Sequence, residues 1–157
     1  MENILNDDDY MLWRLISQTT NAIRKARERE LIKFDLTRTM AAILMISEAT
    51  GGQVTPYKIA SWLIREPHSI SNLLVRMEKA GLIEKKKQPG KKKAVHIQIT
   101  DKGRQAYLEA IKLESVRKIL SAVSKYQRQY LIPILRTMRD EALSQVWLKR
   151  KLPFPPY

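Results

Sequence analysis

The chain has 157 residues, 29 Lys and Arg against 16 Asp and Glu, a formal net charge of +13 and no Cys. This length fits one domain, or a small domain with helical extensions, but not two full domains. The lack of Cys excludes disulfides, cysteine-ligated zinc and iron–sulfur clusters, and only two His are present, so we expect no metal and no cofactor. The longest apolar run, residues 40–46, is far shorter than the roughly 20 residues of a membrane span. With no signal peptide expected either, we predict a soluble, cytoplasmic protein without membrane partners.

The positive charge is concentrated in the middle of the chain. Residues 65–104 contain eleven Lys or Arg and four Asp or Glu, whereas residues 1–64 contain eight of each kind. Such a local excess favours a polyanionic partner, because each phosphate that is neutralised releases condensed counterions. The alternative is a solvated charged face that only keeps the protein soluble.

The N-terminal third predicts two helices. Apolar residues at a spacing of three to four predict a helix over residues 8–30, with Asp7 or Asp8 as its N-cap. A second helix is expected over residues 36–49. It is almost wholly apolar between residues 40 and 46, which indicates burial, and the glycine pair at 51 and 52 ends it.

The next segment predicts a short helix followed by a longer one. Thr55 and Pro56 open the short helix, because Thr is a favoured N-cap and Pro fits the first helical position. The longer helix, over residues 68–80, ends at Gly81. Its predicted core stripe consists of Ile70, Leu73, Leu74 and Met77.

The spacing of the apolar residues then changes from the three to four residues of a helix to the alternation of a strand. Residues 83–87 and 95–99 flank a Pro-Gly turn signal at 89 and 90, which predicts a β-hairpin with a lysine-rich tip. Thr100 is expected to cap one long helix reaching about Val123. Ser124 or a neighbour starts a last helix, which Pro133 should kink. The predicted fold class is mainly α with a small β-hairpin (α+β).

This order of elements, helix, short helix, helix and basic hairpin, is that of a winged helix-turn-helix. Asn and Arg on the outer face of the 68–80 helix can bond base edges, and hairpin lysines suit phosphates and a narrow minor groove. The alternative is that the polar residues at the start of this helix reflect only the usual polarity of a first helical turn and bind no DNA. All six hairpin lysines, at 85–87 and 91–93, fit phosphate contact. The residues predicted to bind DNA are Thr55, His68, Ser69, Ser71, Asn72, Val75, Arg76, Lys79, Lys87, Lys91, Lys92 and Lys93.

At this point the chain resembles the MarR-type winged-helix transcriptional regulators. Residues 55–60 (TPYKIA) resemble the family helix that opens the DNA-binding lobe. Residues 69–71 (SIS) and 76–83 (RMEKAGLI) resemble its recognition helix and exit. Residues 95–103 (VHIQITDKG) resemble the strand and glycine that leave the wing. The order and spacing of these stretches carry the resemblance, which covers nearly the whole chain.

The resemblance implies an obligate homodimer. Its expected parts are an N-terminal dimerisation helix (1–34), a winged helix-turn-helix lobe (35–103), C-terminal dimerisation helices (104–148) and a Pro-rich tail (149–157). Two recognition helices would enter successive major grooves of a double-stranded, pseudo-palindromic operator, with half-sites about 34–36 Å apart. Most members of the family repress transcription.

The resemblance also implies an effector. Many members release DNA when a small phenolic or anionic molecule binds between the dimer helices and the DNA-binding lobe. Residues that could line such a pocket are Trp13, Met40, Met45 and Tyr107. For each of them the alternative is that the side chain only packs in the hydrophobic core or in the dimer interface and contacts no ligand.

The wing departs from the family pattern. The family usually has an Asp-x-Arg or Asp-Arg-Arg element there, whereas this chain has Lys91, Lys92 and Lys93. An arginine fork suits a narrow groove better than lysine does. We therefore expect a less ordered wing that contributes charge more than sequence recognition.

Nothing in the sequence indicates an enzyme, since nucleophile-elbow, phosphate-loop and metal-ligand helix motifs are missing. The net charge and the missing wing Asp keep one main alternative open. It is a non-sequence-specific, nucleic-acid-coating or architectural winged-helix protein, or a module whose lysines meet an acidic partner. A nucleic-acid hydrolase is a third, weaker possibility.

Overall fold

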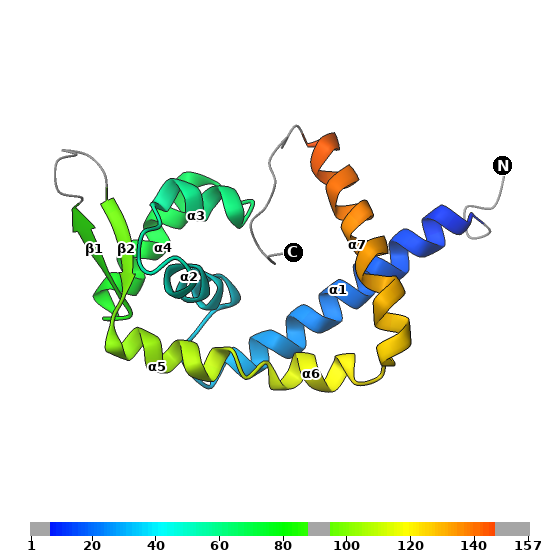
Figure 1. Ribbon diagram of the computed structural model, residues 1–157, viewed down its shortest axis with the longest axis horizontal. Coiled ribbons are helices and arrows are strands. Elements are labelled where there is room, and N and C mark those ends of the chain that lie inside the picture. Colours follow the sequence, from blue (N-terminus) through cyan, green and yellow to red (C-terminus); the bar gives the residue numbers. More distant parts are fainter. Residues whose placement is uncertain (1–6, 88–94, 147–157) are drawn as a thin grey trace. The chain divides into compact units, whose positions relative to one another are not determined.

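The computed structural model describes residues 7–87 and 95–146 (Figure 1). It is mainly helical with one two-stranded antiparallel hairpin, as predicted. The chain divides into two compact units, Met1–Arg117 and Lys118–Tyr157, which we describe separately. The elements are α1 (Asp8–Ile32), α2 (Arg38–Ala49), α3 (Pro56–Trp62), α4 (Pro67–Lys79), β1 (Ile83–Lys87), β2 (Val95–Ile99), α5 (Asp101–Ala110), α6 (Glu114–Leu120) and α7 (Lys125–Gln145).

The predicted N-caps are confirmed by the hydrogen bonds at the helix starts. Asp7 accepts from the Tyr10 amide at 2.8 Å, and Thr55 and Thr100 accept from amides three residues further on. Ser124 forms a capping box with Gln127, in which each side chain bonds the other's backbone N–H. These local side-chain bonds satisfy N–H groups that the first helical turn leaves open, which is why they were predictable from spacing.

The core of the first unit lies among α2, α3, α4 and the hairpin (Figure 1). The hairpin register runs from the pair Ile83 and Ile99 to the pair Lys87 and Val95. Val54 joins it as an isolated bridge, because its carbonyl accepts from the Ile97 amide at 2.9 Å. The side chains that share this core, all nearly inaccessible to solvent, are Ile43, Leu44, Ile46, Val54, Ile59, Ile70, Leu74, Met77, Ile83 and Ile97.

The prediction of one long helix from residue 100 to 123 is wrong. The chain instead forms α5 and α6 with a break at residues 111–113, where Leu113 has a left-handed φ of 53°. The break contains neither Gly nor Pro. A tertiary contact lies at this break: the Glu30 carboxylate of α1 accepts hydrogen bonds from the backbone N–H groups of Glu114 and Ser115 at the start of α6.

The second unit contains α7. Pro133 lies inside this helix, as predicted, and the helix continues on both sides of it. Many of its large apolar and aromatic side chains are exposed, including Tyr126, Tyr130, Ile132 and Ile134. Among the described residues, no helix combines the length and the apolar character needed to cross a membrane.

Candidate nucleic-acid interface

One side of α4 packs into the core and the other side faces solvent. Ile70, Leu74 and Met77 are buried, whereas Leu73 is half-buried. Seven predicted contact residues are exposed on this helix: His68, Ser69, Ser71, Asn72, Val75, Arg76 and Lys79. The exposed side therefore presents hydroxyl, amide and cationic groups together with one small apolar side chain, a combination suited to base edges and phosphates.

The C-terminal end of α4 is held by the start of α5. The Lys102 ammonium group donates to the Ala80 carbonyl at 2.8 Å, and the Thr100 hydroxyl donates to the Gly81 carbonyl at 2.6 Å. Gly81 has φ +71°, the left-handed conformation expected of a helix stop. These bonds satisfy the last carbonyls of α4 and place a cation at its negative end. The positioning role of Lys102 was not predicted from the sequence.

The turn before α4 contains a strained residue. Ile64 has φ +52°, and its N–H donates to Ser61 while the Arg65 N–H donates to Ala60. These two bonds form a Schellman motif, in which glycine usually occupies the left-handed position. Ile is β-branched and carries a steric cost in this conformation.

Replacing Ile64 by Gly should therefore raise the free energy of unfolding by about 1 kcal/mol, since Ile64 is 48% exposed and contributes little to the core. Urea denaturation followed by circular dichroism measures the change. Ile64→Ala is the control, because it removes most of the side chain but keeps the Cβ. If the Ile64→Gly protein is no more stable than the Ile64→Ala protein, the left-handed backbone conformation is not the main source of the strain at this position.

The hairpin carries fewer available cations than its sequence indicates. Lys85 forms an ion pair with Glu78 of α4 at 2.9 Å, and Lys86 pairs with Glu84 at 2.9 Å. Hydrogen bonding by Lys85, opposed by burial, holds the pKa of Glu78 below its ordinary value. Lys85 thus ties β1 to α4, and its contact with phosphate stays a prediction. Lys87 is exposed and forms no ion pair with a described residue.

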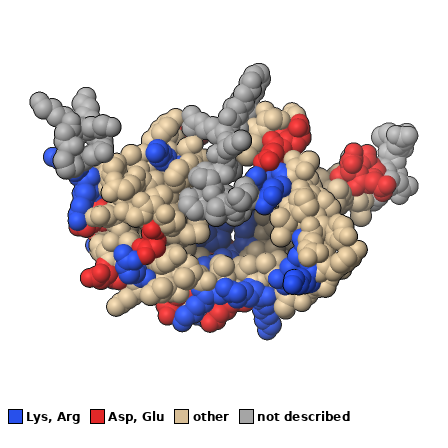
Figure 2. Space-filling model, viewed as in Figure 1, with Lys and Arg blue, Asp and Glu red and all other residues tan. Residues whose placement is uncertain are grey.

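The remaining predicted residues fall in two groups. Thr55 is half-buried, because its hydroxyl caps α3. Lys91, Lys92 and Lys93 lie outside the described residues, as do the expected turn at 89 and 90 and the tail 149–157. On the face shown in Figure 2, Lys and Arg side chains gather along the hairpin at the left of the view.

A cavity of about 240 Å³ lies in the same unit between α1, α2 and the end of α5. Its walls are mainly apolar, and two arginines border it. Of the four residues predicted to line an effector pocket, Met45 is found there. Met40 is buried in α2, Tyr107 is half-buried in α5 and Trp13 is 57% exposed on α1. The residues that line the cavity include Arg27, Leu31, Ala42, Met45, Ala110 and Leu113.

The helix, turn, helix and hairpin define a winged helix-turn-helix DNA-binding protein. Residues 36–103 match a family model described as a winged helix DNA-binding domain. Over 136 residues the chain is 25% identical to an uncharacterized HTH-type transcriptional regulator, YdcH, of Bacillus subtilis (strain 168), covering 84% of this chain and 90% of that one.

Similarity to solved structures shows more closely which class of DNA-binding protein this is. The organohalide-sensing regulator RdhR-CbdbA1625, bound to 2,4-dichlorophenol, is 31% identical with a TM-score of 0.76, covering 86% of this chain and 81% of that one. A mutant MarR from E. coli in complex with operator DNA shares the fold, with 18% identity and a TM-score of 0.72 over 81% of this chain and 92% of that one. The chain belongs to the winged-helix transcriptional regulators, and it shares the fold of MarR.

Proposed function

We propose that the protein is a sequence-specific transcriptional repressor that binds a pseudo-palindromic operator in double-stranded DNA as a homodimer. The observation that carries the proposal is the exposed polar side of α4, anchored at its C-terminal end and beside a basic hairpin. Ser71, Asn72 and Arg76 would read bases, while Lys79 and Lys87 would contact phosphates. The fold shared with an operator-bound MarR structure supports this placement.

Exposed apolar side chains support the homodimer. On α1, Met11, Leu12, Trp13 and Leu15 are each more than half exposed. On α7, a second apolar group, including Leu131, Ile132 and Leu135, is also exposed. Patches of this kind mark association surfaces. A second copy of the chain is the occupant we propose, with the helices outside the 35–103 lobe forming the interface.

Selection of bound duplexes from a randomised pool tests the proposal without knowledge of the operator. Enrichment of an inverted repeat, with half-sites about one helical turn apart, is the expected result. A pool that stays unenriched after repeated rounds would instead support a non-specific coating protein. The selected duplex then serves the mutational tests.

Arg76→Ala should reduce discrimination between the selected duplex and a scramble by about 1–3 kcal/mol, the usual value of one good base contact. Lys87→Ala is the matched control, since it also removes one exposed cation. It should weaken binding to both duplexes alike and lower the salt slope by about 1. Fluorescence anisotropy measures both variants. Unchanged discrimination in Arg76→Ala would contradict the role of this residue in base recognition.

The apolar cavity supports an effector site. The pocket is open to solvent on one side, and its volume of about 240 Å³ gives room for a substituted single ring. Arg27 and Arg38 at its edge would favour an anionic substituent, although each already pairs with a glutamate of α1. We propose a small aromatic effector, phenolic or anionic, that releases the protein from DNA. The similar regulator solved with 2,4-dichlorophenol supports this class of ligand.

Thermal shift with substituted phenols and benzoates tests the site. A ligand that binds only the folded state raises the melting temperature with concentration. Ala42→Phe should abolish the shift, because the larger ring fills the cavity that Ala42 lines. A shift that survives this substitution would place the ligand elsewhere.

A further inference from the structure

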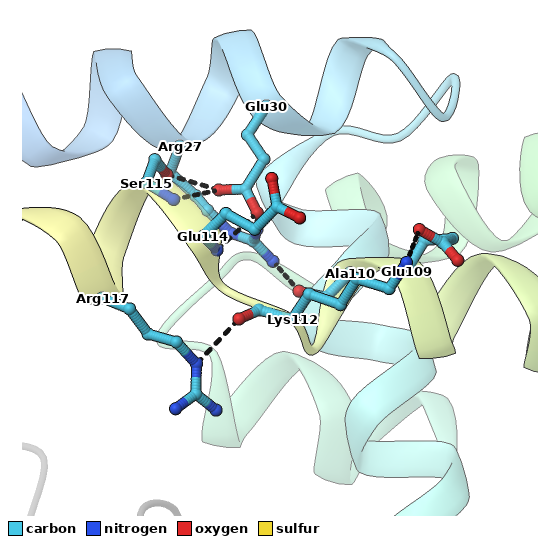
Figure 3. Close-up of polar contacts among 8 residues, drawn as sticks. All are labelled: Arg27, Glu30, Glu109, Ala110, Lys112, Glu114, Ser115 and Arg117. Atoms are coloured by element: carbon cyan, nitrogen blue, oxygen red, sulfur yellow. Dashed lines mark hydrogen bonds and ion pairs between the residues drawn. The ribbon is translucent and has the colours of Figure 1, made fainter.

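Two side chains of α1 reach the corner between α5 and α6, where Arg117 Nε of α6 also donates to the Lys112 carbonyl at 2.8 Å (Figure 3). Glu30 Oε1 accepts from the Glu114 N–H at 2.9 Å, and Glu30 Oε2 accepts from the Ser115 N–H at 3.2 Å and from the Ser115 hydroxyl. The Arg27 guanidinium pairs with Glu30 at 2.8 Å and donates to the Ala110 carbonyl. One ion pair thus binds the last carbonyl of α5 and the first N–H groups of α6.

Both side chains are withdrawn from solvent. The side chains of Arg27 and Glu30 are 12% and 8% exposed, so a change at either one disturbs a buried pair rather than a surface one. Leu113 adopts the left-handed conformation although it is not Gly, Asn or Asp, which indicates that surrounding contacts impose it.

We infer that Arg27 and Glu30 are positioning residues that set the direction in which α6 leaves the DNA-binding lobe, and thereby the separation of the two lobes in the dimer. The inference rests on the proposed function, since it concerns how two α4 helices are spaced on an operator. Half-site spacing is fixed by that separation in dimeric helix-turn-helix proteins. Arg27, Ala110 and Leu113 also line the cavity described above, so an occupant of the cavity would touch the corner.

Glu30→Gln tests the inference, because Gln keeps the size of the side chain and removes the charge. Glu28→Gln is the matched control: Glu28 lies on the same helix and pairs with Arg38 of α2 instead of reaching the corner. Amide hydrogen exchange reports on the corner directly. The amides of Glu114 and Ser115 should exchange about tenfold faster or more in Glu30→Gln, and at the wild-type rate in Glu28→Gln.

The lobe separation needs a distance measurement. Because the chain has no Cys, a single Lys58→Cys substitution at an exposed position of α3 gives one spin label per subunit. Glu30→Gln should broaden or shift the distribution of distances between the two labels, whereas Glu28→Gln should leave it unchanged. Selection of duplexes with variable spacers should show the same change in preferred half-site spacing.

The outcomes separate the inference from the proposed function. If the labelled protein with wild-type Glu30 showed no coupling between two spin labels, the proposed homodimer would be wrong. The hydrogen-exchange measurement would still decide whether Glu30 holds the corner. The inference would be overturned if the Glu114 and Ser115 amides exchanged at the wild-type rate in Glu30→Gln. It would also be overturned if these amides exchanged faster but the distance between the two spin labels stayed unchanged. If Glu30→Gln does not fold, Ser115→Ala, which removes one bond to Glu30, replaces it.

Discussion

Gly103→Ala should lower the free energy of unfolding by about 3 kcal/mol or more, because the added methyl group has no space. Gly103 is buried in the first turn of α5, and a Cβ there would overlap the Leu82 carbonyl oxygen and lie 2.9 Å from Ile99 Cγ1. Alanine is favoured over glycine inside a helix by only about 1 kcal/mol. The free-energy cost of overpacking against the backbone exceeds that gain, because a carbonyl group cannot move aside as a flexible side chain can.

Gly51→Ala separates this steric effect from backbone conformation. Gly51 has φ +57°, and no atom of a described residue lies within 4 Å of the position that an added methyl group would take, so only the left-handed cost of about 1–2 kcal/mol applies. Urea unfolding at neutral pH measures both variants. A Gly103→Ala protein as stable as Gly51→Ala would show that α5 does not pack this closely on the Leu82 backbone.

Glu30→Gln should cost about 3 kcal/mol at pH 7. Burial raises the pKa of Glu30, but hydrogen bonds from the Ser115 and Arg27 side chains and from the Ser115 and Glu114 backbone together lower it from 4.5 to about 2. A depression of this size corresponds to roughly 3 kcal/mol of folding free energy from the ionised form. Substitution also leaves the buried Arg27 charge without its partner.

The pH dependence of the Glu30 contribution has a definite sign. Because the pKa is lower in the folded state, the carboxylate stabilises the protein fully above about pH 4.5, and the contribution is lost as the pH falls from 4.5 towards 2. The difference in unfolding free energy between wild type and Glu30→Gln should therefore shrink across that range. A difference that stays constant from pH 7 to pH 3 would show that Glu30 is not held ionised by these bonds.

Local features of the fold were predictable from the sequence. The caps at Asp7, Thr55 and Thr100 depend on residues three positions away, and the hairpin follows from alternating residues around a turn signal. The break between α5 and α6 was not predictable in this way. Glu30 lies more than eighty positions before Ser115, so no periodicity or spacing within residues 100–123 reveals the contact.

The candidate site was predictable to a similar extent. The exposed side of α4 follows from helical spacing, because the residues between the core stripe positions must face outward. The pairing of Lys85 with Glu78 was missed, since it joins a strand to a helix across a turn. The cavity was also missed except for Met45, because its walls come from three separate helices.

The most direct test of the proposed function is fluorescence anisotropy of the purified protein with the selected duplex and a composition-matched scramble, each over a salt series. Log affinity should fall with log salt for both, with a slope of about −0.9 per phosphate contact. The proposal predicts that two subunits bind the selected duplex about 10³-fold or more tightly than the scramble. Equal affinity for both duplexes at every salt concentration would contradict sequence-specific recognition by α4.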